Sequence, residues 1–263
     1  MAFSFFSFAP LSQADKNPKR LSFTQCVRSC HSVSLHAENS ECSNMRSNVF
    51  TYADDGSLSM MSVESMKTVR EFGGASRMAM ESNEGTRCVY EDNTITVNTP
   101  NKISVYTLEN GKVAKGVMTE GDVVTEIVYE YDAAGYIAKT VTKVMGIIKT
   151  MTFVWESGRL VAYSSENSGS VTSFALKYSN NGKECSGYNA MIPDIIFSDA
   201  LAVACPELFG AVQTAVPSGI DIAEDGYSKT VEIKSVFDDD GYIGYCEAVY
   251  GEEYFESYEY SWE

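Results

Sequence analysis

The chain has 263 residues, of which 44% are hydrophobic and 21% are charged, and this composition is that of a folded globular protein. A formal net charge of -16 disfavours nucleic acid and anionic membrane surfaces as partners, because no cluster of Lys and Arg beyond Lys16, Lys19 and Arg20 offsets it locally. A chain of this length buries roughly 70 to 75% of its unfolded surface, so it needs neither a disulfide nor a metal to fold.

Residues 1–46 are predicted to form a signal-like apolar start and a disordered or tethering arm. The apolar stretch from Ala2 to Leu11, followed by Ser12-Gln13-Ala14, has the length of a signal-peptide core and a small-x-small cleavage pattern. No positively charged segment precedes it, so a clipped secretion signal and a short apolar arm both stay open. The stretch is too short to span a bilayer.

The cysteines do not predict a metal site. Seven Cys is an odd number and no CxxC occurs, so at least one thiol is left over if the others pair, and the pairing and the redox compartment stay open. The arm contains metal-like residue types whose spacing matches no zinc module. We therefore expect thiols on a flexible arm, with no metal and no cofactor; the residues concerned are Cys26, Cys30, His31, His36 and Cys42.

A repeated hairpin pattern begins near Val49 and defines the second region, residues 47–263. Asp or Asn followed closely by Gly reverses a strand, because the side chain bonds to the following backbone and Gly takes positive φ without steric cost. Four of the turn glycines, Gly111, Gly135, Gly158 and Gly182, are 24, 23 and 24 residues apart. The prediction is all-β: an antiparallel up-and-down meander of hairpins forming a curved open sheet or a barrel. The expected turn residues are Gly56, Gly111, Asp132, Gly135, Gly158, Gly182 and Gly241.

The hairpin at 123–145 allows a detailed register prediction. A loop of Ala133, Ala134 and Gly135 makes Asp132 face Tyr136, and an uninterrupted ladder then pairs Tyr131 with Ile137, Tyr129 with Lys139 and Ile127 with Val141. In this register both faces carry charge: Lys139 and Lys143 lie on one, and Glu126 and Glu130 on the other. Charge on both faces argues against a lipid-embedded barrel, whereas the aromatic alternation of Tyr258, Tyr260 and Trp262 in the last strand keeps that alternative open.

The hairpin rhythm stops between Tyr188 and Ile222. Pro193, Pro206 and Pro217 interrupt this apolar stretch, so it cannot be a transmembrane helix. We expect one or two short helices near 194–212 that cover an open end or edge of the sheet, one of them capped by Ser198 and ending at Cys205 before Pro206.

Several phrases together resemble a Bacteroidales family of secreted or lipoprotein-like domains of unknown function with a porin-like β fold. They are YEYDAAGYI, FVWESGRLVAYSS, LAVACPELFG followed by AVPSG, and VFDDDGYIG, within residues 100–263. The turn phrase alone is also similar to the YD repeats of Rhs-type surface proteins. The resemblance implies an extracytoplasmic protein, whether periplasmic, at the cell surface or secreted, with no catalytic residues to carry over. The chain departs from that family where FTQC before Cys26 is a poor lipobox.

Catalytic motifs are not evident in the sequence. A nucleophile–base pair generally needs a His near Ser or Cys, and both His lie in the expected arm. Walker, GxGxxG and HExxH motifs are absent. Trp155 and the many Tyr could stack on sugars but fit a core better. Carboxylate pairs fall mostly at predicted turns, where Asp serves turn geometry; they are Asp54-Asp55, Glu91-Asp92, Glu224-Asp225, Asp238-Asp239-Asp240 and Glu252-Glu253.

These observations favour a non-enzymatic secreted or periplasmic β-sheet protein that binds or scaffolds at the cell envelope, with a glycan or an envelope protein as the open partner classes. One alternative is a glycan-active hydrolase, which requires two carboxyl groups about 5 to 10 Å apart across a cleft. Another is an outer-membrane barrel, which requires a continuous uncharged external belt.

Overall fold

A computed structural model of the chain describes residues 18–28, 40–53, 57–70, 76–82, 86–99, 101–179, 184–186, 189, 191–197, 199–210, 212–250 and 254–262. The described residues form a 17-stranded sheet, two short α-helices and one 3-10 helix. Among them, no helix has both the length and the apolar character needed to cross a membrane.

The strands have the following bounds: β1 Pro18–Arg28, β2 Ser40–Tyr52, β3 Leu58–Arg70, β4 Ser76–Ser82, β5 Thr86–Glu91, β6 Thr94–Asn98, β7 Ile103–Glu109, β8 Lys112–Glu120, β9 Val123–Tyr131, β10 Ile137–Val144, β11 Ile147–Glu156, β12 Arg159–Asn167, β13 Ser170–Lys177, β14 Gly219–Glu224, β15 Tyr227–Phe237, β16 Ile243–Tyr250 and β17 Tyr254–Trp262. The helices are α1 Met191–Phe197, α2 Ala200–Ala204 and the 3-10 helix η2 Pro206–Phe209.

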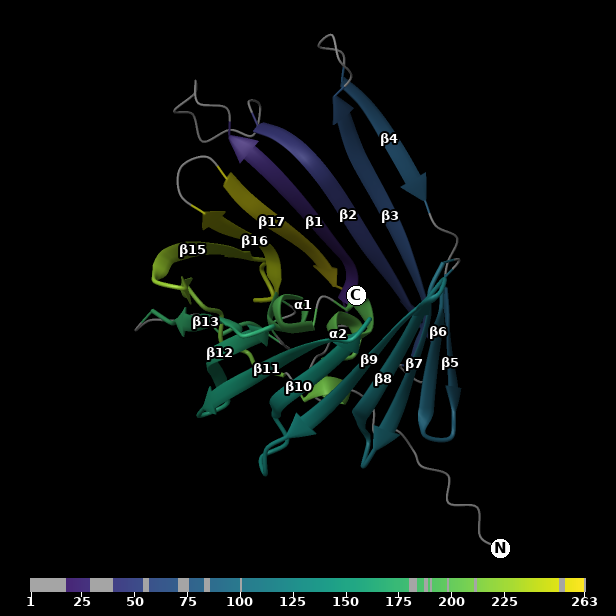
Figure 1. Cartoon of the computed structure of the whole chain (residues 1–263). Helices are drawn as coiled ribbons and strands as arrows, with labels where there is room; N and C mark the ends of the chain where they lie inside the picture. Colours follow the sequence, from purple (N-terminus) through teal and green to yellow (C-terminus); the bar gives the residue numbers. More distant parts are fainter. Residues whose placement is uncertain are drawn as a thin grey trace, which may run out of the picture.

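The pairing is antiparallel throughout and confirms the up-and-down meander. Each strand from β5 to β16 pairs with the next one in sequence. Strand β3 pairs with β2, with β4 over its second half, and with β5 through Met60 and Met61. Strand β1 pairs with both β2 and β17, so it links the end of the meander to its beginning. Figure 1 shows the strands arranged around α1 and α2.

Strand β1 and the first half of β2 lie in the segment expected to be a tether. Strands β1 and β2 begin at Pro18 and Ser40 and take their places in the sheet. The tether expectation came from local composition, whereas the partner of β1 on one side, β17, lies more than 200 residues away in sequence. The apolar start, His31 and His36 lie outside the described residues.

Five of the expected turn residues are described, and they sit between strands. Gly111, Gly135, Gly158 and Gly241 have φ of 78°, 87°, 77° and 86° and follow β7, β9, β11 and β15. Asp132 Oδ1 accepts hydrogen bonds of 2.9 Å from both the Ala134 and Tyr136 amides, which fixes its turn. Gly56 and Gly182 lie outside the described residues, and after β13 the chain leads into α1 rather than into a paired strand.

A β-bulge corrects the register expected for β9 and β10. Asp132 does face Tyr136, and Tyr131 does pair with Ile137, but the register then shifts, so that Lys139 pairs with Glu130. Tyr129 therefore faces Thr140 and Ile127 faces Thr142, rather than Lys139 and Val141. All four charged side chains consequently share the outer face, with Lys139 Nζ 3.2 Å from Glu130 Oε1.

The bulge recurs in the same place after four described turn glycines. The register shifts three positions after each of them, at Ala114, Ala138, Val161 and Gly244, and a fifth shift falls at Ser59. The aliphatic side chain one position earlier is completely or almost completely buried every time: Leu58, Val113, Ile137, Leu160 and Ile243. We call these five residues the anchor positions. The repeat thus encodes a turn, an apolar anchor and a bulge.

Aromatic side chains donate hydrogen bonds to the backbone carbonyls of four of the anchor positions. A bulge leaves a backbone group without its ladder partner, and a buried carbonyl must find another donor. Tyr131 OH donates to Val113 O, Trp155 Nε1 to Ile137 O and Tyr178 OH to Leu160 O, each at 2.7 Å, and Trp262 Nε1 donates to Ile243 O at 2.8 Å. In each case the donor lies 18 or 19 residues after its acceptor, so successive hairpins are linked by the same contact.

The helices confirm the expectation of short helices near 194–212, and they fill the concave side of the sheet. Ile192, Leu201 and Phe209 are fully buried, and the Phe209 ring lies edge-on to Tyr106 and Tyr129 at centroid distances of 6.0 and 5.6 Å. Helix α2 is capped by Asp199, whose Oδ1 accepts the Leu201 amide at 2.9 Å, while Ser198 lies outside the described residues. Pro206 does end α2, but it also starts η2.

Candidate functional site

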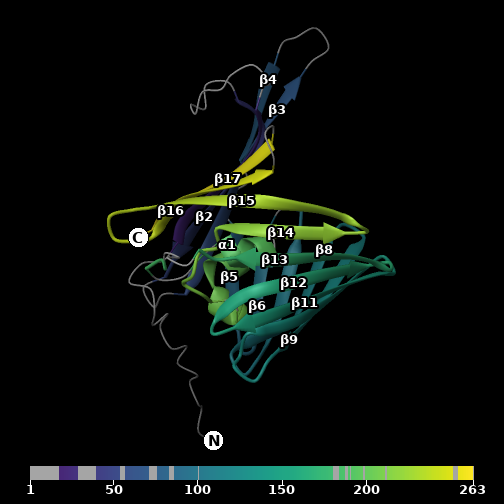
Figure 2. The ribbon, with the colours of Figure 1, turned by 90° about the vertical axis from the view of Figure 1, so that its left-hand side faces the viewer.

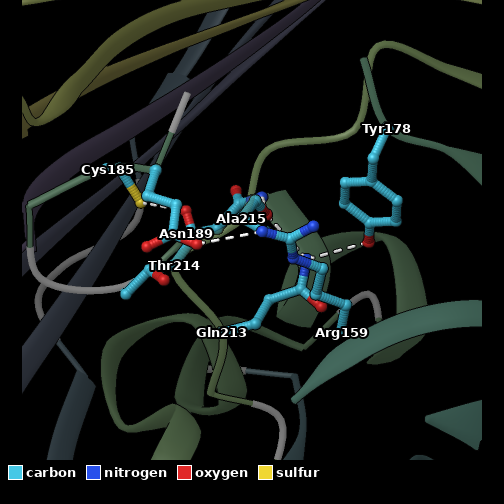
Figure 3. A network of polar contacts seen from close by, with 8 residues as sticks. Arg159, Tyr178, Cys185, Asn189, Gln213, Thr214 and Ala215 are labelled. Carbon is cyan, nitrogen blue, oxygen red and sulfur yellow. Dashed lines mark hydrogen bonds and ion pairs between the residues drawn. The ribbon is translucent and has the colours of Figure 1, made fainter. Parts of the chain in front are cut away.

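A buried polar network fixes the segment after α2 to the sheet (Figure 3). Gln213 Oε1 accepts the Leu160 amide at 2.8 Å, and its Nε2 donates to Tyr178 OH and to Ala215 O. Asn189 Nδ2 donates to the same Ala215 carbonyl at 3.0 Å. Gln213 therefore supplies the acceptor that the bulge after Leu160 requires, and the network serves the fold.

The thiol in this network is buried and hydrogen-bonded. Cys185 Sγ donates to Thr214 O at 3.1 Å, and burial raises the pKa of this thiol to about 12. A thiol with such a pKa remains protonated and unreactive near neutral pH. Arg159, at the edge of the network, forms an ion pair of 3.0 Å with Glu184 and lies over the Tyr178 ring.

A second cluster of titratable groups surrounds the end of α2. Burial raises the pKa of the Glu207 carboxyl to about 7, while the Lys112 ammonium offsets part of this rise. Burial also raises the pKa of Cys88 to about 11 and that of Cys205 well above its ordinary value. Both thiols are therefore protonated at neutral pH. No group of His, Cys, Asp and Glu among the described residues has a geometry suited to a metal ion.

The concave side contains a small apolar cavity of about 70 Å³. Its lining includes the stacked rings of Tyr163 and Phe174, whose centroids are 4.2 Å apart, and Met191 of α1 closes it on one side. Sites for drug-sized ligands are about 300 to 1,000 Å³. This cavity is thus too small for a sugar or a peptide, because the helices occupy the space that a ligand would need.

The described carboxylate pairs lie at separate strand ends. Glu91 and Glu224 end β5 and β14 and are followed by Asp92 and Asp225, and Asp238-Asp239-Asp240 follows β15. Asp238 Oδ1 accepts the Asp240 and Tyr242 amides at 3.0 and 2.8 Å, which is a structural role in its turn. Asp54-Asp55 and Glu252-Glu253 lie outside the described residues.

Trp155 has a structural position. Its ring stacks on Tyr136 at a centroid distance of 4.7 Å, and its Nε1 donates to the Ile137 carbonyl. The side chain is half-buried, and the ring stacking and the hydrogen bond are both made within the sheet. Trp155 therefore links two hairpins, which agrees with the expectation that it fits a core better than a sugar-binding surface.

Charge lies on the outer face of the strands. Lys115 pairs with Glu126 at 3.4 Å and Lys177 with Asp221 at 2.6 Å, in addition to the Lys139–Glu130 pair. All these side chains are more than a third exposed. The outer face of β8–β10, β13 and β14 therefore does not form the continuous uncharged belt that a lipid-embedded sheet requires.

Exposed apolar side chains gather where β9, β10, β11 and β13 begin or end, and sequence reasoning missed this feature. We call this set the apolar end. Figure 2 shows β12, β14 and β15 extending beyond α1, so that one end of these strands lies away from this helix. The signal was present in VMGII, an apolar turn phrase in a chain whose other turns are polar. The apolar end comprises Val123, Val124, Met145, Ile147, Ile148 and Val171.

Comparisons with known proteins identify the fold. No family model matches the chain, and no curated protein sequence matches it significantly. A crystal structure of a porin-like protein from Bacteroides uniformis is similar, with a TM-score of 0.70, 14% identity and coverage of 94% of this chain and 98% of that one. A porin-like protein from Bacteroides vulgatus has a TM-score of 0.61 and 14% identity, with coverage of 91% and 97%. At identities this low, the structural similarity shows a shared fold alone.

Proposed function

We propose that this chain is a non-catalytic binding module of the bacterial cell envelope that contacts its partner through the apolar end. The observation that carries the proposal is the gathering of exposed Val, Met and Ile side chains at adjacent turns of a sheet whose outer face carries ion pairs on β8–β10, β13 and β14. Soluble proteins keep such side chains scattered unless the surface has a use.

The filled interior supports binding at the surface. The helices take up the concave side, and the cavity of about 70 Å³ lined by Tyr163, Phe174 and Met191 has no room for a ligand of ordinary size. The thiols of Cys185, Cys205 and Cys88 have raised pKa values, and Asp238 accepts amides of its own turn, which supports a binding role for the chain.

Sequence and structural resemblances support the location in the cell envelope. The phrases in residues 100–263 resemble extracytoplasmic domains of Bacteroidales, and two solved structures of the same fold are described as porin-like proteins of Bacteroides. The apolar start at Ala2 to Leu11 has the length of a signal-peptide core.

The test is fractionation of a Bacteroides strain that expresses the full chain with its own N-terminus. The chain is expected in the envelope or periplasmic fraction, and the double variant Val124→Asp, Ile148→Asp is expected to lose its association with other envelope material. Val236→Asp is the matched control, because Val236 is also exposed, at 60%, but lies on β15 outside the apolar end.

Two results would overturn the proposal. One is an association that the double variant and the control retain equally. The other is hydrolysis in a broad glycan and ester panel that disappears when one carboxylate, for instance Asp225 or Asp239, is changed to Asn.

A further inference from the structure

Resting on the proposed function, we propose that the β10–β11 tip inserts into the headgroup layer of a phospholipid bilayer. The tip consists of Met145, Ile147 and Ile148, with Val123 and Val124 beside it. Its apolar side chains would reach the acyl boundary, while Lys143 and Lys149 would bind lipid phosphate groups.

Met145 is an unusual residue for its backbone conformation. It precedes Gly146 in a two-residue turn in which both have positive φ, 48° and 80°. Such turns strongly favour Asn or Asp at the first position, because a larger side chain in the left-handed region is strained. The described residues include five other non-glycine positions of this kind, occupied by Asp92, Asn110, Ser157, Ser168 and Asp225.

Met145 is also the most exposed large hydrophobic residue in the part of the chain that the structure describes, at 80%. A strained backbone and an exposed apolar side chain both act against stability, and their coincidence at one position indicates a use for that side chain. Methionine is flexible and polarizable and adapts to irregular apolar surroundings.

The neighbouring apolar side chains extend the tip. Ile147 and Ile148 follow the turn and are 49% and 55% exposed. Val144 pairs with Thr125 of β9, which places Val124 beside Met145. The apolar side chains thus come from two adjacent hairpins and lie at the very end of the strands, where they can enter a layer without the rest of the sheet.

Two lysines flank the tip. Lys143 pairs across the hairpin with Ile148, and Lys149 with Thr142. Lys143 faces Glu126 across β9 and β10, but this carboxylate forms its ion pair with Lys115, at 3.4 Å. Neither Lys143 nor Lys149 forms an ion pair with a described residue, whereas Lys139 and Lys177 each do. Cations beside a projecting apolar group match a surface of phosphate headgroups over an apolar layer, because the lysine stems can lie along the apolar region with the ammonium at the phosphates.

A bilayer fits this surface better than a folded protein does. A protein interface of standard size involves roughly 20 to 30 residues on each side, and it needs a matching shape. A protruding two-residue turn offers neither, but an interfacial apolar group has to penetrate only about 5 to 10 Å. Because the whole chain carries a charge of -16, the favoured surface is zwitterionic: net anionic lipid repels the body of the protein.

The experiment is flotation of the purified full chain with vesicles of phosphatidylcholine and with vesicles of equal parts phosphatidylcholine and phosphatidylglycerol. We expect binding to phosphatidylcholine, and weaker binding to the mixed vesicles at low salt that increases as salt screens the repulsion. Met145→Asp and Ile148→Asp should each weaken binding about tenfold or more, because each removes an apolar anchor and adds a charge that must be desolvated. Val236→Asp should bind as the original chain does.

Met145→Asn separates binding from folding. Asn accepts the left-handed conformation more readily than Met, so this variant should raise the melting temperature while it weakens vesicle binding several-fold. Lys143→Gln with Lys149→Gln should also weaken binding, whereas Lys234→Gln, at a distant exposed lysine, should not.

Failure of this inference differs from failure of the proposed function. If the chain does not float with either vesicle, or if Met145→Asp and Ile148→Asp float as well as the original chain, the lipid inference is overturned. The proposed function survives if the double variant at the apolar end still loses envelope association in cells. A photo-crosslinking residue at position 145 that labels a protein rather than lipid would likewise overturn the lipid inference and leave the proposed function standing.

Discussion

Glu207 is a partly buried carboxylate in η2 whose pKa is raised to about 7 by burial. The unfolded chain releases this proton near pH 4.5, while the folded chain holds it up to about pH 7. Between these values the folded state binds more protons than the unfolded state, so stability increases as pH falls. Below the lower value the contribution is constant, and above pH 7 the buried charge lowers the free energy of unfolding.

We expect Glu207→Gln to stabilise the protein by about 2 kcal/mol at pH 8 and to have little effect near pH 4.5. Urea denaturation of both proteins across this pH range gives the difference. The other carboxylates contribute equally to both proteins, so the difference isolates Glu207. A difference that is constant from pH 4.5 to 8 would contradict the proposed environment of this carboxyl.

At the scale of single elements, the turn residues were predictable because the information is local. Asp132 and Gly135 lie within one turn, and their hydrogen bonds involve only neighbouring amides. The bulge at Ala138 was not predictable in the same way. Its stabilising contact, from Trp155 to the Ile137 carbonyl, comes from the next hairpin, so a register drawn for one hairpin alone continued without a shift.

The anchor contacts between hairpins can be tested with a hydroxyl deletion. Tyr131→Phe removes the donor to Val113 O and leaves that carbonyl without its 2.7 Å partner. An unsatisfied buried acceptor costs about 1 to 3 kcal/mol, which urea denaturation would measure as a lower midpoint. Tyr245→Phe is the matched control. Its hydroxyl bonds to the Glu247 carboxylate on the outer face, which water can satisfy, so the expected loss is below about 0.5 kcal/mol. Equal losses in the two variants would refute the anchor role.

Close approach of η2 to the β9–β10 turn depends on Gly210. This residue has a φ of 64°, and a Cβ there would overlap the Gly135 carbonyl oxygen and lie 3.0 Å from Tyr131 Cε1. Gly111 has a similar φ of 78° but nothing within 4 Å of its Cβ position. Gly111→Ala should therefore cost only the backbone strain, about 1 to 2 kcal/mol, whereas Gly210→Ala should cost about 2 kcal/mol more.

Thermal and urea denaturation of the two alanine variants measure this difference. Comparable losses would mean that η2 moves away from the turn without penalty. In that case the helices would be a loose covering of the sheet rather than part of its core.

At the scale of the whole molecule, the sequence predicted the strand class but not the first strands or the apolar end. The hairpin period described only local reversals, so it could not reveal that β1 bridges β2 and β17. The apolar end was missed for a related reason. The predicted hairpin at 123–145 already brought Val124 and Met145 together, but their exposure, at 48% and 80%, depends on how the surrounding strands and helices pack.

The bridging role of β1 leads to a prediction about the whole sheet. Deletion of residues 1–28 removes the pairings that run from Arg20↔Val49 to Arg28↔Ser40 on one side and from Pro18↔Trp262 to Val27↔Tyr254 on the other. Strands β2 and β17 then become edges with unpaired amides and carbonyls, and such edges pair with other chains. The shortened protein should unfold at a lower temperature and form oligomers, as measured by calorimetry and by light scattering after gel filtration.

Deletion of residues 1–17 is the matched control, because it keeps every described pairing of β1. This shorter truncation should retain the melting temperature and the oligomeric state of the full chain. If both truncations behave alike, β1 contributes nothing to the sheet, and the meander from β2 to β17 must be stable with its two edges unpaired. The contrast between the two truncations therefore decides whether the first strand stabilises the whole sheet or only lies against it.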